Sequence, residues 1–280
     1  EIDEMVDRGV FNKNKNVIPV TIKGLLPGEP KRPEWMKVKA NLGSEYIELK
    51  NLINEKKLNT VCEEASCPNI YECWSMGTAT FMIMGDTCTR ACGFCDVNTG
   101  KPSDLDELEP IRVAESVKTM KLTHAVVTSV NRDDLDDGGS KFFAKTIQEI
   151  KLMNPSTSVE VLIPDFKGDR RAIDNIINES PEVLNHNLET VPRLQREIRT
   201  AASYGRSLSL LQYAKEVNFS GKTKTGLIVG MGEDFDEVIS VLKDVSQIDI
   251  DIVTIGQYLR PTSKHRPIHR YVTQDEFNES

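Results

Sequence analysis

The stretch Gly85-Asp86-Thr87-Cys88-Thr89-Arg90-Ala91-Cys92-Gly93-Phe94-Cys95 is the most informative part of the sequence. It places three cysteines at C-x3-C-x2-C spacing, directly after the apolar run 79–84. A second trio lies upstream at C-x4-C-x5-C spacing and consists of Cys62, Cys67 and Cys73. These are all 6 cysteines of the chain, so none of them is left as an incidental core residue.

Short apolar runs alternate with helical stretches from residue 79 onward. The runs are 79–84, 125–130, 159–163, 183–188, 225–229 and 252–258. The candidate helices are 112–121, 140–153, 169–179, 193–201, 206–217 and 234–246. Two of the helices have plausible N-terminal caps, Asp169 and Asp234. Alternating strands and helices predict an α/β fold with a parallel sheet and right-handed crossovers. Since six βα units are fewer than the eight of a closed barrel, we expect a partial (βα)6 TIM-type barrel.

We expect three parts along the chain: an N-terminal extension over 1–78 that carries the upstream cysteines, the barrel over 79–260, and the start of a C-terminal extension over 261–280. Prolines exclude regular structure near the middle of the first part. Helical spacing predicts a helix over 44–57. We expect Trp35 to anchor the extension onto the barrel.

Composition limits the classes of partner. The chain has 35 basic and 43 acidic residues and a net charge of −8, which argues against nucleic acid or an anionic membrane as the main partner. No apolar run approaches the roughly 18 residues of a membrane span. We expect a cytoplasmic protein, and in that reducing compartment clustered cysteines more often bind metal or do redox work than form disulfides.

The two cysteine trios leave several kinds of site open. Zinc would need a fourth ligand for each trio, and the chain has 4 histidines. Disulfides lack an evident purpose in a chain of this length. The spacing differs from the C-x2-C-x2-C run of bacterial ferredoxins. A short loop with three cysteines can instead hold three corners of a [4Fe–4S] cube and leave its fourth iron open.

The segment 88–95 resembles the C-x3-C-x-aromatic-C loop of the radical S-adenosylmethionine (SAM) enzymes. Within that superfamily the sequence is most similar to the lipoyl synthase family, whose auxiliary-cluster motif resembles Val61-Cys62-Glu63-Glu64-Ala65-Ser66-Cys67-Pro68-Asn69. Further segments that resemble this family are 84–90, 128–134, 185–192 and 256–262. The resemblance covers about residues 30–277.

The resemblance implies two [4Fe–4S] clusters and SAM as cofactors. It assigns Cys88, Cys92 and Cys95 to the cluster that reduces SAM, and Cys62, Cys67 and Cys73 to an auxiliary cluster that is the sulfur source. The implied activity is that of a sulfurtransferase, which inserts two sulfur atoms at C6 and C8 of a protein-bound octanoyl-lysine to form the lipoyl group. The family pattern ends in an Arg-Ser-Ser-Tyr stretch whose serine is the fourth auxiliary ligand; these 280 residues contain no such stretch, so none is assigned.

The resemblance also implies partners. The substrate would be an octanoylated lipoyl carrier domain or H protein. Reduced ferredoxin or flavodoxin would supply electrons, and a further factor would rebuild the consumed cluster. Two other functions stay open: another radical SAM enzyme with an auxiliary cluster, and a non-enzymatic iron–sulfur carrier.

Candidate contacts to SAM follow from the expected strand ends, where chemistry gathers in barrels of this kind. Phe94 can present backbone to the adenine, and Asp137 with Gly138 lies where related enzymes place a Gly-rich segment near the methionine amino group. The remaining candidates are Ser129, Asn131, Asn187, Glu189 and Arg199. Each has a structural alternative, because strand-end polar residues also cap helices and an arginine often lies on a helix surface.

Other motifs give weaker signals. The segment 226–233 lacks the third glycine of a dinucleotide fingerprint, because residue 235 is Phe, and is interpreted as a strand exit. We interpret His124 and His186 as structural. His265 and His269 belong to a basic tail that is either solvated or meets an acidic carrier domain.

Overall fold

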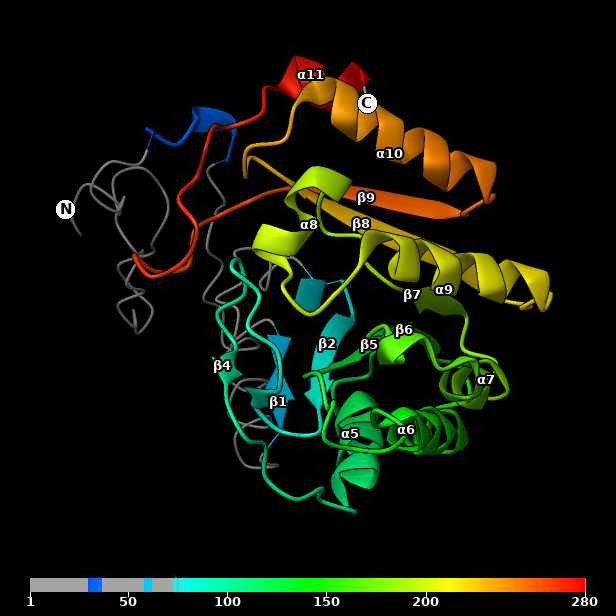
Figure 1. Ribbon diagram of the computed structural model, residues 1–280. Helices are drawn as coiled ribbons and strands as arrows, with labels where there is room; N and C mark the ends of the chain where they lie inside the picture. Colours follow the sequence, from blue (N-terminus) through cyan, green and yellow to red (C-terminus); the bar gives the residue numbers. More distant parts are fainter. Residues whose placement is uncertain (1–29, 37–57, 62–72, 75, 280) are drawn as a thin grey trace.

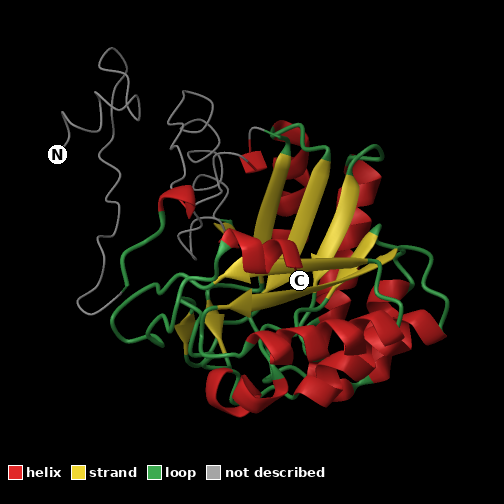
Figure 2. Cartoon of the chain, turned by 90° about the horizontal axis from the view of Figure 1, so that it is seen from above, coloured by secondary structure: helices red, strands yellow, loops and turns green. Residues whose placement is uncertain are grey.

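The computed structural model describes residues 30–36, 58–61, 73–74 and 76–279. A 7-stranded sheet with the order β1-β2-β5-β6-β7-β8-β9 runs through this part of the chain (Figure 1). Its strands are β1 (Asn59–Thr60), β2 (Thr78–Ile83), β5 (His124–Ser129), β6 (Ser158–Leu162), β7 (Val183–Asn185), β8 (Lys222–Val229) and β9 (Ile252–Gln257). β1 pairs antiparallel with β2, and every later neighbouring pair is parallel. The expected six parallel strands are confirmed, and the strand directions turn strongly across the sheet (Figure 2).

Helices connect the parallel strands, as expected. They are α5 (Glu109–Thr119), α6 (Ser140–Met153), α7 (Arg170–Ile177), α8 (Pro192–Ile198), α9 (Tyr204–Glu216) and α10 (Phe235–Gln247). A further helix, α11 (Gln274–Glu279), follows the last strand. Short elements complete the described part: η1 (Glu34–Met36), η2 (Phe166–Gly168), and the two-stranded sheet of β3 (Thr87–Cys88) and β4 (Asn98–Thr99). The cap at Asp169 is confirmed by a bond from Arg171 N, at 3.0 Å. At the start of α10, Glu237 accepts a hydrogen bond from Asp234 N at 2.9 Å, as in a capping box.

Two boundaries differ from the sequence expectation for a physical reason. α5 begins at Glu109 rather than at 112, because Pro110 is tolerated in a first helical turn, where its missing N–H costs no hydrogen bond. The strand expected over 183–188 ends at Asn185. Beyond Asn185 the pairing with β8 is reduced to single contacts, such as the bond from His186 N to Lys224 O and the isolated bridge of Glu189 with Leu227.

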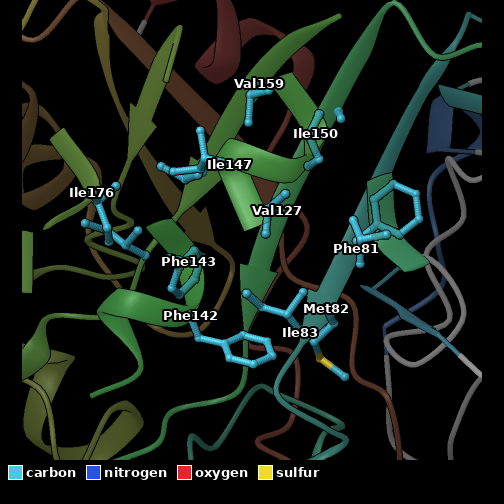
Figure 3. Packing of buried hydrophobic residues seen from close by; sticks show 14 of the residues in the cluster. Phe81, Met82, Ile83, Val127, Phe142, Phe143, Ile147, Ile150, Val159 and Ile176 are labelled. Atoms are coloured by element: carbon cyan, nitrogen blue, oxygen red, sulfur yellow. The ribbon is translucent and has the colours of Figure 1, made fainter. Parts of the chain in front are cut away.

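One face of the sheet packs against the helices. Alternate residues of β2, β5, β6 and β7 point to this outer face, and they form a buried cluster with side chains of α6. Members drawn in Figure 3 are Phe81, Val127, Val159, Phe143, Ile147 and Ile150. Burial of each large apolar side chain contributes roughly 1.5–3 kcal/mol, so this face holds the sheet and helices together.

The opposite face, here called the inner face, carries the alternate residues. Glu160 and Lys224 form an ion pair of 2.9 Å on it across β7, and Asn185 donates to the same carboxylate at 3.1 Å. Toward the carboxyl end of β9, Thr254 and Gly256 occupy the inner face and are exposed. The interior of a closed barrel is filled with side chains. Here the sheet is open, and its inner face is accessible along β9.

The N-terminal extension contacts the C-terminal helix. Trp35 packs edge-to-face on Phe277 of α11, with ring centroids 6.1 Å apart, so the observed contact is with the C-terminal extension rather than with the barrel as expected. The expected helix over 44–57, together with Cys62 and Cys67, lies outside the described residues. Among the helices that are described, none has the length and apolarity to cross a membrane.

Candidate functional site

Residues 88–95, here called the cysteine loop, follow β2 at the carboxyl end of the sheet. Backbone hydrogen bonds fix the loop at both ends. Gly100 N donates to Cys88 O at 3.0 Å, and Gly93 N donates to Ile198 O at the end of α8 at 2.8 Å. An isolated antiparallel bridge pairs Cys92 with Arg199. The loop has little regular structure of its own, so these contacts determine its shape.

The three thiols of the loop lie within electrostatic reach of one another and are free of disulfides. Burial raises the pKa of the Cys92 thiol to about 11, although the nearby Arg199 lowers it. Burial also raises the pKa of Cys95. Thiols that are buried together gain from binding metal, because the metal displaces their protons.

A site for a single metal ion is not formed in the part of the chain that the structure describes, where no three His, Cys, Asp or Glu side chains converge on one point. In a [4Fe–4S] cube each cysteine binds a different iron, so the thiols need not converge. Three free, half-buried or buried thiols on one short loop fit such a cluster.

Asn131, which follows β5, braces the first cysteine. Its backbone N donates to Cys88 Sγ at 3.3 Å, and its carbonyl accepts from Thr89 N at 3.0 Å and from Thr89 Oγ1 at 2.9 Å. Hydrogen bonds to the cysteine sulfurs are among the features by which a protein tunes an iron–sulfur cluster. The structure thus places Asn131 beside the cysteine loop through its backbone.

Buried polar atoms without partners lie at the end of β5 and beyond the end of β7. Glu189 Oε2 and Ser129 Oγ are buried and have no hydrogen-bond partner among the described residues. Burial raises the pKa of Glu189, whereas Arg199 and a hydrogen bond from Asn187 lower it. An unpaired buried oxygen usually marks a place where a ligand or water binds. The contacts of these atoms with SAM stay predictions.

Arg199 and Phe94 are also placed at the site. Arg199 ends α8 and is buried, with Nη1 donating to Leu188 O at 3.0 Å, so the alternative of an exposed helix arginine does not hold. Phe94 is half-buried and packs against a buried cluster that includes Leu188 and Val229. Their contacts with SAM stay predictions.

Asp137 and Gly138 have a structural explanation. The Asp137 carboxylate accepts from Gly139 N and Lys141 N, both at 3.0 Å, and so caps α6. Gly138 has a φ of +61°, and a Cβ there would lie 2.8 Å from the Phe166 ring. The contact of this segment with the methionine amino group stays a prediction.

Sequence reasoning missed two sets of contacts with the loop. Arg90 joins an ion-pair network with Asp133, Asp165 and Arg206. His265, assigned from sequence to a basic tail, lies with Nε2 2.9 Å from Cys95 O. For the Arg90 network, the only available signal was a charged residue between two cysteines. For the His265 contact, no feature of the local sequence indicated it.

The remaining sequence interpretations near the site are resolved by their hydrogen bonds. His186 is a buried core residue, as expected, with its ring nitrogens 2.7 Å from Ile163 O and 2.8 Å from Ser207 Oγ. His124 is structural as well, and bonds Ser158 and Glu160. Residues 230–233 form a strand exit, in which Glu233 accepts from Gly230 N and Met231 N.

Two family models match the sequence. That of the Radical SAM superfamily matches residues 82–245, and that of the N-terminal domain of lipoyl synthase matches residues 22–67. The lipoyl synthase of Christiangramia forsetii is 52% identical over 264 residues, which cover 94% of this chain and 89% of that protein. The mitochondrial lipoyl synthase of Nematostella vectensis is 52% identical over 90% of this chain and 86% of its own length.

The chain belongs to the lipoyl synthase family. The lipoyl synthase of Rubrobacter xylanophilus, at 54% identity over 89% of this chain and 78% of that protein, agrees. Within this lipoyl synthase family member, the cysteine loop lies in the matched radical SAM region, and Cys62 and Cys67 lie in the matched N-terminal region. Both family models therefore include cysteines of the two motifs.

Solved structures of low sequence identity share the fold. HydG, a maturase of the [FeFe]-hydrogenase, superposes with a TM-score of 0.59 at 14% identity, over 85% of this chain and 60% of that one. Methylornithine synthase superposes with a TM-score of 0.55 at 15% identity, over 83% of this chain and 65% of that one. They support the α/β partial-barrel fold.

Proposed function

We propose that this chain is a lipoyl synthase, a radical SAM sulfurtransferase that inserts two sulfur atoms at C6 and C8 of a protein-bound octanoyl-lysine. One observation carries the proposal: a chain about half identical to lipoyl synthases over most of its length folds three free thiols onto one loop at the carboxyl end of its sheet. Unpaired buried oxygens lie at the end of β5 and beyond the end of β7, where a charged small molecule can bind.

The six cysteines are the proposed ligands. Cys88, Cys92 and Cys95 would hold the cluster that binds SAM, and Cys62, Cys67 and Cys73 the auxiliary cluster. When bound, the clusters and SAM supply a 5′-deoxyadenosyl radical that takes hydrogen from an unactivated carbon, and the sulfur that replaces it. We assign no fourth auxiliary ligand.

The chain's own residues would bind and orient SAM. Glu189 gains most from a cationic partner, because its carboxylate is buried and one oxygen is unpaired. Arg199 faces it with the opposite charge and suits a carboxylate. Ser129 at the end of β5 and Asn187 beyond β7 offer neutral donors and acceptors, and Phe94 offers apolar surface. Together these side chains would hold SAM in one orientation and exclude water from it.

The acyl-lysine arm would reach the site along the inner face of the sheet. Thr254 and Gly256 leave that face accessible at β9, and no described atom lies within 4 Å of a Cβ built on Gly256. An extended chain on a flexible lysine needs such an opening, because its carrier domain stays outside. The proposed substrate is a lipoyl carrier protein. Reduced ferredoxin or flavodoxin would supply electrons, a further factor would rebuild the consumed cluster, and the proposed location is the cytoplasm.

Anaerobic reconstitution with iron, sulfide, SAM and an octanoyl-lysyl peptide tests the proposal by mass spectrometry. We expect 5′-deoxyadenosine together with a peptide in which two hydrogens are replaced by two sulfurs, and about eight irons per chain. Cys88→Ala should abolish 5′-deoxyadenosine formation. Cys67→Ala should retain it but form no sulfur-containing peptide.

Three outcomes would contradict the proposal in different ways. Formation of 5′-deoxyadenosine by the unaltered chain without sulfur insertion would favour another radical SAM enzyme. Cluster transfer to acceptor proteins without SAM cleavage would favour an iron–sulfur carrier. Loss of SAM cleavage in Cys67→Ala would show that the two cysteine trios do not act separately.

A further inference from the structure

Arg90 is the charged residue of the cysteine loop and stands between Cys88 and Cys92 in the sequence. Its side chain is buried. Its Nε and Nη2 donate to the two oxygens of Asp133, at 2.6 and 2.8 Å. Nη2 also donates to Asp165 at 2.7 Å. A guanidinium held by two carboxylates in this way has a fixed position, because its planar fork matches their geometry.

Asp165 connects this arginine to the rest of the barrel. Its side chain is fully buried, and its second oxygen accepts from Arg206 of α9 at 2.8 Å. The backbone N of Lys167 donates to the first oxygen at 3.1 Å. The network thereby joins the cysteine loop to the exits of β5 and β6 and to α9.

Nothing else in the loop's sequence can form such an ion pair, since its other residues are uncharged. The neighbouring backbone is tied to the same place: Thr89 Oγ1 accepts from Asp133 N at 3.1 Å, and the Arg90 carbonyl accepts from Thr99 Oγ1 at 3.3 Å. The bond from Asn131 N to Cys88 Sγ comes from the same segment as Asp133. Movement of this segment would shift the first cysteine and Arg90 together.

We infer that Arg90, held by Asp133 and Asp165, is a positioning residue that fixes Cys88 and Cys92 relative to each other before a cluster binds. The inference rests on the proposed function, because it concerns the cluster assigned to these cysteines. Groups that orient metal ligands typically change metal affinity or activity by about 10- to 100-fold when they are removed.

The test compares Arg90→Met, Arg90→Lys and Asp165→Asn with the unaltered chain. The matched control is Asp134→Asn, which removes the same charge from a neighbouring ion pair with Arg132 that does not include the loop. The readouts are the rate of iron loss to a chelator, the electron paramagnetic resonance signal that responds to SAM, and its midpoint potential. Unfolding midpoints of the metal-free chains report stability separately.

We expect Arg90→Met and Asp165→Asn to lose iron from the SAM-responsive cluster about 10- to 100-fold faster than the unaltered chain, with an altered signal. Arg90→Lys keeps the positive charge but loses the forked donors of the guanidinium, so its rate of iron loss should lie between those of Arg90→Met and the unaltered chain. Asp134→Asn should match the unaltered chain. If Arg90→Met does not fold, Arg90→Lys and Asp133→Asn decide in its place.

Unchanged iron release and an unchanged signal in the folded Arg90 and Asp165 variants would overturn the inference. The inference would also be overturned if Asp134→Asn accelerated iron loss as much as the Arg90 and Asp165 variants, with each increase in proportion to the loss of stability. The network would then be only structural. Failure of the proposed function is distinguishable: in that case Cys88→Ala would leave any SAM-responsive signal intact, or the unaltered chain would show none.

Discussion

Burial determines the charge of single side chains around the cysteine loop. It raises the pKa of Cys92 to about 11 and also raises that of Glu189. It lowers the pKa of His186 to about 4, because the ring has no contact with water and Arg199 lies nearby. Burial disfavours the charged form in all three cases.

His186 should make stability depend on pH. The unfolded chain binds a proton at this residue near 6.5, and the folded chain only near 4, so the unfolded state holds more protons between these values. The contribution of neutral His186 to the free energy of unfolding is therefore fully present above pH 6.5 and decreases as the pH falls toward 4. We expect the free energy of unfolding of the metal-free chain to fall by about 2 kcal/mol from pH 7 to pH 5 on account of this residue.

Urea unfolding at both pH values measures this effect. His186→Gln, which cannot titrate, should show a smaller difference between them. His124→Gln is the control, because that ring is partly exposed and lies on the inner face away from Ser207. An equal pH dependence in the unaltered chain and His186→Gln would show that other groups are responsible.

At the scale of elements, loops at the carboxyl ends of the strands serve both the helices and the site. α6 begins at Ser140, directly after the Asp137–Gly138–Gly139 turn, and the Asp137 carboxylate accepts from Gly139 N in the turn and from Lys141 N in the helix. The same turn was predicted to contact SAM. A carboxylate that already accepts three hydrogen bonds has less capacity for another partner.

Asp137→Ala should lower the free energy of unfolding by about 1 kcal/mol, because α6 loses its cap. Burial alone would raise the pKa of Asp137, but the hydrogen bonds from Lys141 N and Gly139 N lower it below its ordinary 3.8. This stabilisation is therefore present above pH 3.8 and is lost as the pH falls further. Thermal or urea unfolding checks the change, with the exposed Asp136→Ala as control.

Binding of SAM to the reconstituted Asp137→Ala variant separates the two roles of this residue. Unchanged affinity would mean that the carboxylate only caps α6. Weaker binding, with a loss of stability no larger than expected for a cap, would support the predicted contact with the methionine amino group.

At the scale of the whole molecule, the sheet separates a packed outer face from an accessible inner face. The helices cover the outer face, and the Glu160–Lys224 pair lies on the inner one. β9 is an edge strand with Ile252, Val253, Thr254 and Gly256 exposed. An edge of this kind admits a substrate from outside, which a closed barrel would allow only at its mouth.

Gly256→Phe should obstruct this route. The substitution meets no described atom within 4 Å at its Cβ and no positive φ, so we expect the fold to be kept. The large ring on the inner face should lower kcat/KM for the octanoyl-lysyl peptide by about tenfold or more, as expected when a substrate is displaced by about 1 Å. Cleavage of SAM without peptide should be retained.

Gly205→Phe is the matched control for size, because Gly205 is an exposed glycine of α9 that also has no atom near its Cβ. It should leave peptide kinetics unchanged. Equal kinetics for the unaltered chain and the Gly256 variant would show that the acyl chain takes another route.

The sequence by itself determined the cysteine motifs, the six parallel strands and the cap at Asp169, because each depends on spacing or on residues a few positions apart. It could not determine how Arg90 meets Asp165, 75 positions away, or how His265 reaches Cys95 across 170 positions. Those contacts exist only once parallel strands bring their carboxyl ends to one edge. Burial likewise set the pKa of His186 and left Glu189 with an unpaired oxygen, since it depends on what packs around a residue rather than on its neighbours in the chain.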